Sequence, residues 1–210
     1  MEDFNRKKHW ETIYQTKSPG EVSWFQPVPE TSLGLFRQLD IQPTAKIIDI
    51  GGGDSLLVDF LLNQGFEDIT VLDISETALE KAKQRLGQHA SKVKWIVADV
   101  VNFKPTELYD VWHDRAAFHF LTREEEVLTY LNIVQQSLNP SGFVIIGTFS
   151  EQGPKKCSGI EIKQYSEASM SETLNPFFEK VDCIMVDHQT PFQTIQNFIF
   201  CCFKKRTPAV

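Results

Sequence analysis

The sequence lacks any uninterrupted apolar run near the roughly 18–20 residues that a membrane-spanning helix needs. Its charged first residues, 1–9, are not followed by the apolar core of a secretory signal. Internal repeats, low-complexity tracts and linkers are missing as well. These absences argue against a membrane protein and predict a cytoplasmic chain whose 210 residues, 1–210, form a single domain.

Cysteine and dense positive charge are also scarce. The four cysteines include no C-x-x-C pair and no histidine cluster at zinc spacing accompanies them, so no metal site is predicted. Cys183, Cys201 and Cys202 lie in apolar runs, where we expect reduced thiols that pack as small hydrophobic groups, and we expect Cys157 to be partly exposed. The formal net charge of −7, with basic clusters only near the two ends, disfavours a nucleic-acid partner.

From residue 46 onward, stretches typical of strands and helices alternate. Strands are predicted at 46–50, 69–73, 93–97, 109–113, 143–149, 180–187 and 194–203. Helices are predicted at 54–63, 76–86, 123–138 and 167–175, after two earlier ones at 3–14 and 29–39, and Ser75 and Thr122 are placed to cap two of them. Repeated β-α-β units predict a mostly parallel sheet covered on both faces. The short connection between the last two strands requires an antiparallel hairpin, which gives a seven-stranded, three-layer α/β sandwich.

Distinctive residues follow the first four strands, and ligands of open α/β sheets bind beyond the carboxyl ends of strands. After the first strand, Asp49-Ile50-Gly51-Gly52-Gly53 supplies glycines that let the backbone approach a ligand closely. Asp73 ends the second strand, where a carboxylate can accept hydrogen bonds from both ribose hydroxyls of an adenosine. Asp99 follows the third strand and can accept a hydrogen bond from an adenine amino group. Each residue alone also fits an ordinary turn, strand end or loop, but the ordered series is much more specific.

The glycine loop departs from the dinucleotide-binding fingerprint G-x-G-x-x-G. Counted from Gly51, the third small position holds Leu56, which is too large for close helix packing. This departure disfavours a nicotinamide-dependent oxidoreductase.

The whole series resembles the class I S-adenosylmethionine-dependent methyltransferase family. Residues 49–53 match its D/E-x-G-x-G motif, and Asp73 and Asp99 match the acidic residues after its second and third strands. Residues 138–142, Leu-Asn-Pro-Ser-Gly, are similar to the L-x-P-G-G turn before its fifth strand, with Ser141 replacing a glycine. The resemblance spans residues 46 to 203 and implies a Rossmann-like core over 41–210, S-adenosyl-L-methionine as cofactor and S-adenosyl-L-homocysteine as product.

The resemblance also implies roles for individual residues. Asp73 would hold the ribose, Asp99 with Val100 the adenine, and Asp49 the amino group at the methionine end. The residues implied in cofactor binding are Trp24, Asp49, Gly51, Gly52, Gly53, Asp73, Ile74, Asp99, Val100 and His113. The segment 1–40 would form a helical lid whose aromatic faces attract the cationic sulfonium, although the same aromatics also fit ordinary helix packing. These lid aromatics are Trp10, Tyr14, Trp24 and Phe25.

The run from 112 to 120 is the candidate acceptor site. Its polar members could orient a carboxylate or phosphate through Arg115, or accept a proton at His119. The catalytic candidates are His113, Asp114, Arg115 and His119. The alternative is that Asp114 pairs with Arg115 and the histidines cap the next helix. The D-R pair is similar to thiopurine- and tellurite-resistance-type methyltransferases, and the N-terminal aromatics also resemble some protein-lysine methyltransferases, so the subgroup stays open.

The predicted function is transfer of a methyl group by in-line displacement to a small-molecule nucleophile. A compact acidic chain without an added recognition domain favours a small acceptor over a protein. A protein-lysine methyltransferase and a protein that binds S-adenosylmethionine without turnover are the alternatives. Residues 113–116 stand where DNA and glutamine methyltransferases carry N/D-P-P-Y, which argues against those two classes.

Overall fold

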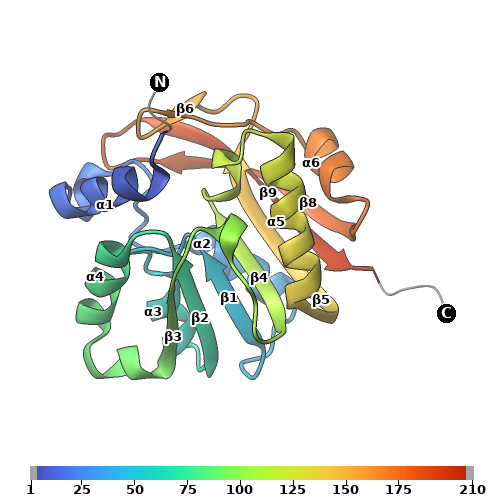
Figure 1. Ribbon diagram of the computed structural model, residues 1–210, viewed down its shortest axis with the longest axis horizontal. Coiled ribbons are helices and arrows are strands. Elements are labelled where there is room, and N and C mark those ends of the chain that lie inside the picture. The colour runs from blue at the N-terminus through green and yellow to red at the C-terminus, as the bar shows by residue number, and fades with distance from the viewer. Residues whose placement is uncertain (1–3, 207–210) are drawn as a thin grey trace.

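The computed structural model describes residues 4–206, in which a central sheet has seven strands in the order β3-β2-β1-β4-β5-β9-β8 (Figure 1). The strands are β1 (Lys46–Ile50), β2 (Asp68–Asp73), β3 (Val93–Val97), β4 (Tyr109–Arg115), β5 (Leu138–Phe149), β8 (Phe178–Gln189) and β9 (Ile195–Lys205). Strands β1 to β5 run parallel, whereas β9 is antiparallel to β5 and β8 is antiparallel to β9. A separate short pair joins β6 (Lys156–Cys157) to β7 (Ile160–Glu161). The predicted mostly parallel sheet with a late antiparallel hairpin is confirmed.

Helices cover both faces of the sheet. They are α1 (Arg6–Thr16), α2 (Glu30–Gln38), α3 (Leu57–Asn63), α4 (Glu76–Leu86), α5 (Glu124–Ser137) and α6 (Glu167–Leu174). Apolar residues of α5 and α6 share one core with Ile48 and Trp112, and those of α2, α3 and α4 share the other with Ile47 and Val111. Neighbouring strand residues serve opposite cores because successive side chains point to opposite faces. The three layers are therefore those predicted.

The starts of α4 and α5 test the two capping residues predicted from the sequence. Ser75 caps α4, since its Oγ accepts a hydrogen bond from the backbone N–H of Ala78 at 3.1 Å. The expected Thr122 cap is wrong, because the N-cap residue of α5 is Arg123. Three glutamates, 124–126, fill the first turn of α5, where negative charge complements the helix dipole.

The cysteines differ from the expectation of reduced thiols at Cys183, Cys201 and Cys202 and a partly exposed Cys157. Cys183 in β8 and Cys201 in β9 are bonded as a disulfide, with Cα atoms 4.1 Å apart. They stand directly opposite each other in the antiparallel register, which brings together residues separated by 18 positions. Cys157 and Cys202 are free, and Cys157 is buried rather than partly exposed.

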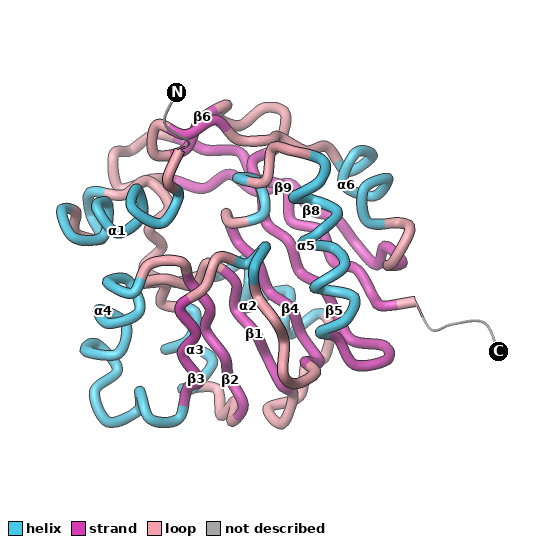
Figure 2. Tube along the Cα trace, in the orientation of Figure 1, coloured by secondary structure: helices cyan, strands magenta, loops and turns pink. Residues whose placement is uncertain are grey.

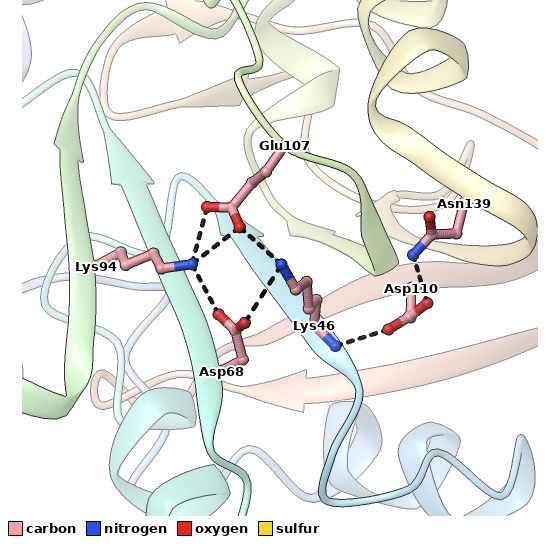
Figure 3. A network of polar contacts seen from close by, with 6 residues as sticks. All are labelled: Lys46, Asp68, Lys94, Glu107, Asp110 and Asn139. Carbon is pink, nitrogen blue, oxygen red and sulfur yellow. Dashed lines mark hydrogen bonds and ion pairs between the residues drawn. The ribbon is translucent and has the colours of Figure 1, made fainter.

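A network of charges ties the amino ends of the first strands together (Figure 3). The Nζ atom of Lys46 lies 3.1 Å from Glu107, and the Nζ atom of Lys94 lies 3.0 Å from Asp68 and 2.9 Å from Glu107. The backbone N–H of Lys46 also donates to Asp110 at 2.8 Å. Because each pair is partly exposed, it contributes little energy, but together the pairs favour one register of β1, β2 and β3.

The N-terminal helix α1 lies against α4 (Figure 2). Residues of α1 also line a pocket at the carboxyl ends of the strands. Between residues 4 and 206, we find no helix with both the length and the hydropathy of a membrane span.

Candidate active site

A pocket lies at the carboxyl ends of β1, β2, β3 and β4, where the strand order reverses between β1 and β4. This switch point is where open α/β sheets bind ligands. Most residues predicted to bind the cofactor line it, namely Trp24, Asp49, Gly51, Gly52, Asp73, Ile74, Asp99, Val100 and His113. Gly53 stands just behind them, because a Cβ atom there would lie 2.7 Å from the Tyr14 hydroxyl and 2.9 Å from Asp73 Oδ2.

The loop after β1 has room for no side chain. Gly51 has φ +63°, and a Cβ atom on it would lie 2.7 Å from the Cβ of Ala117. A Cβ atom on Gly52 would lie 2.7 Å from both Asp49 Oδ2 and a methyl group of Val71. The loop therefore presents bare backbone to the pocket, as a close approach to a ligand requires.

Arg85 of α4 supports this loop and was missed by sequence reasoning. Its guanidinium donates to the carbonyl oxygens of Asp54 at 3.3 Å and Ser55 at 2.8 Å. It also contacts the Asp54 carboxylate and binds Asp59 through Nε at 3.1 Å and Nη2 at 2.9 Å. An arginine in the last turn of a helix suggests only dipole complementation, so nothing in the sequence marked this contact.

Asp49 is the first member of a buried polar chain. Its Oδ1 lies 2.7 Å from His113 Nδ1, and His113 Nε2 lies 2.8 Å from the hydroxyl of Ser32. A carboxylate only accepts, so we assign the imidazole proton to Nδ1, with Nε2 accepting from Ser32. His113 thus orients Asp49 at the pocket wall with both of its nitrogens occupied.

Asp73 and Asp99 differ in electrostatic setting. Asp73 Oδ1 accepts from the backbone N–H of Ser75 at 2.8 Å, and burial, with Asp49 and Glu11 nearby, raises the pKa of Asp73 to about 7. Asp99 Oδ1 accepts from the N–H of Val101 at 3.2 Å, and its Oδ2 forms an ion pair with Arg6 at 3.3 Å. Both carboxylates lie at the pocket, where ligand hydroxyl or amino donors can reach them.

The predicted lid aromatics Trp10, Tyr14, Trp24 and Phe25 all line the pocket. The Trp10 ring lies 5.6 Å from Trp24 and 5.1 Å from Phe120, both edge-to-face, which adds Phe120 as a member that the sequence did not suggest. Aromatic faces of this kind attract a cationic sulfonium.

Two side chains, neither predicted as part of the site, fix α1 over the pocket. Glu11 caps α4, accepting from the N–H groups of Glu76 at 2.6 Å and Thr77 at 3.3 Å. Arg6 bridges Asp99 to Glu126 of α5, which it contacts at 2.7 Å. α1 is thereby held to two helices on opposite faces of the sheet.

The four catalytic candidates separate into two groups. His113 and Arg115 line the pocket, whereas Asp114 and His119 are not among its lining residues. Asp114 is buried and accepts from the N–H groups of Ala117 and Phe118, both at 3.0 Å, and from the Tyr130 hydroxyl at 2.8 Å. It therefore shapes the loop after β4. It forms no pair with Arg115, because adjacent strand residues point to opposite faces.

His119 is buried behind the pocket. The backbone N–H of Phe149 lies 3.4 Å from its Nδ1, and burial together with the Arg115 charge lowers the pKa of His119 to about 3. The imidazole is therefore neutral at physiological pH.

The fold and the strand-end pocket are those of an α/β protein with a ligand site at the switch point of its sheet. Residues 47–142 match a family described as methyltransferase domain. The chain is 26% identical over 144 residues to the mouse (Mus musculus) eEF1A lysine and N-terminal methyltransferase, covering 68% of this chain but only 20% of that protein. It is 30% identical over 158 residues to EEF1A lysine methyltransferase 2 of Danio rerio, covering 67% of this chain and 66% of the relative.

Among solved structures, the N-methyltransferase NodS from Bradyrhizobium japonicum WM9 in complex with S-adenosyl-L-homocysteine has the same fold. The TM-score is 0.73 at 15% identity, covering 97% of this chain and 100% of NodS. With the strand-end motifs and the bare-backbone loop, these matches identify the class. The chain therefore carries a class I S-adenosylmethionine-dependent methyltransferase domain, whose cofactor is S-adenosyl-L-methionine.

Proposed function

We propose that the chain transfers the methyl group of S-adenosyl-L-methionine to a small-molecule nucleophile held inside the pocket. The observation that carries this proposal is the continuity of the pocket. It runs from Asp73 and Asp99 at the nucleoside end to Arg115, Phe120 and Cys157, beneath the N-terminal segment 6–29. An acceptor surrounded on these sides is a small molecule or a single side chain.

The residues present fit the cofactor. Glycines 51–53 would give it a bare backbone surface, Asp73 and Ile74 would hold the ribose, and Asp99 with Val100 would hold the adenine. Asp49, oriented by His113, accepts from the amino group at the methionine end. When bound, the cofactor supplies an activated methyl: the acceptor lone pair bonds to its carbon while the carbon–sulfur bond breaks and leaves its electron pair on sulfur.

The side chains of the pocket favour positioning over base catalysis. Both His113 nitrogens are occupied, and burial raises the pKa of the Cys157 thiol to about 12. His119, the sequence-based candidate for accepting a proton, lies behind the lining. Because a neutral thioether is a good leaving group, orientation and exclusion of water suffice for an acceptor that is already nucleophilic.

A protein-lysine acceptor is the second candidate. Two relatives bear lysine methyltransferase names, and the rings of Trp10, Trp24 and Phe120 suit the cationic amine of a lysine side chain. The chain matches only 20% of the length of the mouse relative, so the substrates in that protein's name are not assigned to this chain.

The test is transfer of labelled methyl from S-adenosyl-L-methionine in a cell extract divided into a protein fraction and a protein-free metabolite fraction. We expect label in metabolites, and none when Gly52→Val blocks the loop. Asp40→Asn, at an exposed position outside the pocket, serves as the matched control. Label confined to protein bands would replace the proposal with the lysine candidate. Label in neither fraction would contradict methyl transfer to a small molecule and to a protein alike.

A further inference from the structure

The side chain of Arg115 has an unusual setting at the end of β4. Its Nη1 donates to the carbonyl oxygen of Trp24 at 3.0 Å, and its guanidinium carbon lies 5.1 Å from the centre of the Phe198 ring. Its Nε and Nη2 are buried, and within residues 4–206 neither has a hydrogen-bond partner. Two neighbouring N–H donors of a pocket-lining arginine are thus unused.

The surroundings of Arg115 contain no anion that pairs with it within the described chain. Asp49 is a carboxylate whose charge acts on Arg115, and its Oδ1 is bonded to His113. The other titratable neighbours are His119, His188 and Cys157, whose pKa values shift toward the neutral forms because of burial. Burial lowers the pKa of Arg115 to about 10, so the guanidinium stays charged at neutral pH. Buried charges in proteins are normally paired, which leaves the pairing here to a ligand.

We propose that Arg115 is an anion subsite that holds a carboxylate of the methyl acceptor through Nε and Nη2. This edge of the guanidinium presents two parallel N–H groups that match the two oxygens of a carboxylate. The inference rests on the proposed function and narrows it, because an acceptor of this class is a carboxylate-bearing small molecule and not a lysine side chain.

Position on the sheet favours the acceptor over the cofactor as the source of the carboxylate. Asp73 and Asp99 follow β2 and β3 on one side of the switch point. Arg115 ends β4 and contacts Phe198 of β9, on the other side. The nucleoside thus extends away from Arg115, and the acceptor end of the pocket lies toward it.

The first test asks whether Arg115 binds a carboxylate of the methyl acceptor or the carboxylate of the cofactor. Calorimetry compares S-adenosyl-L-homocysteine with 5′-methylthioadenosine, which lacks the amino-acid end, in wild type, Arg115→Gln and the exposed-arginine control Arg37→Gln. We expect all three proteins to bind each nucleoside within about twofold. A tenfold loss for S-adenosyl-L-homocysteine alone in Arg115→Gln would assign the arginine to the cofactor carboxylate and overturn the acceptor assignment.

The second test classifies the acceptor. Protein-free metabolites are separated by anion exchange into retained and unretained fractions, with and without phosphatase treatment, and each is incubated with methyl-labelled cofactor. We expect label in the retained fraction, resistant to phosphatase, with an initial rate reduced roughly ten- to hundredfold in Arg115→Gln, as for loss of charged hydrogen bonds. Arg115→Lys, which keeps the charge but loses the paired N–H groups, should retain an intermediate rate, and Arg37→Gln the full rate.

The other outcomes are distinguishable. Label only in the unretained fraction would overturn the anion subsite and leave methyl transfer to a small molecule standing. Phosphatase-sensitive label would replace the carboxylate with a phosphate. Label in neither metabolite fraction would count against the proposed function itself.

Discussion

At the scale of single residues, burial of Asp73 favours the neutral carboxyl group, whereas binding of a ribose suits the charged carboxylate. Asp73 is only 5% exposed at the end of β2, and burial together with Asp49 and Glu11 raises the pKa of its carboxyl to about 7. A group whose folded-state pKa lies above its unfolded value of 3.8 stabilises the fold less as pH rises between those two values. The carboxylate suited to a ribose therefore costs stability at neutral pH while the pocket is empty.

We expect Asp73→Asn to be more stable than wild type, because the amide can keep the hydrogen bond from Ser75 without a charge to bury. The advantage should grow by about 2–3 kcal/mol between pH 5 and pH 8 in the free energy of unfolding, measured with urea. Asp40→Asn, at an exposed position, should show no such trend. A difference that is the same at both pH values would mean that Asp73 titrates normally.

The sequence predicted the position of a side chain where that residue lies at or just after the end of a strand. Asp49, Asp73 and Asp99 could be placed at one edge because parallel strands end there together. Asp114 lies inside β4, next to His113, so strand alternation alone turns it away from the pocket. His119 could not be placed, since Ala116 has φ +65° and turns the chain sharply after β4. A positive φ at an alanine has no sequence signature, so the sides on which its neighbours lie were not predictable.

At the scale of elements, α1 is held over the pocket by aromatic and polar contacts together. None of its residues is fully buried. Trp10 contacts Trp24 and Phe120, whereas Glu11 caps α4 and Arg6 joins Asp99 to Glu126. The sequence predicted a helix and aromatic lid here, but the contacts of Glu11 span more than 60 positions and depend on tertiary structure. Elements with few buried contacts open at low free-energy cost, as a lid must.

We expect Glu11→Ala to loosen the lid. Loss of the cap should lower the free energy of unfolding by about 0.5–2 kcal/mol, and dissociation of S-adenosyl-L-homocysteine should become several-fold faster. Stopped-flow tryptophan fluorescence, reported by Trp10 and Trp24, measures that dissociation. The exposed Glu67→Ala variant is the control. An unchanged dissociation rate in Glu11→Ala would show that the cap does not limit ligand release.

At the scale of the whole molecule, the alternation of strands and helices was sufficient to predict the layers and the antiparallel hairpin. It was not sufficient for the disulfide, because pairing of Cys183 with Cys201 depends on the exact register of β8 and β9. A shift of one residue would turn one cysteine to the opposite face. The bridge lies in the hairpin at the side of the sheet away from β2 and β3.

We expect reduction of this bridge to affect stability and not cofactor binding. Opening a loop of 18 residues should lower the free energy of unfolding by about 1–3 kcal/mol, measured with urea with and without dithiothreitol. The affinity for S-adenosyl-L-homocysteine should stay within twofold. Four titratable thiols in the unfolded, unreduced protein would contradict the bridge.

The central claim is that one adenosyl group is held jointly by residues at the ends of three successive strands. Calorimetry with S-adenosyl-L-homocysteine on wild type, Asp49→Asn, Asp73→Asn and Asp99→Asn tests it most directly, with Asp40→Asn as control and NAD as competing ligand. The account predicts one site per chain, a loss of about 1.5–3 kcal/mol in each of the three pocket variants, and no binding of NAD. Wild-type affinity in Asp73→Asn and Asp99→Asn, or equal binding of NAD, would contradict it.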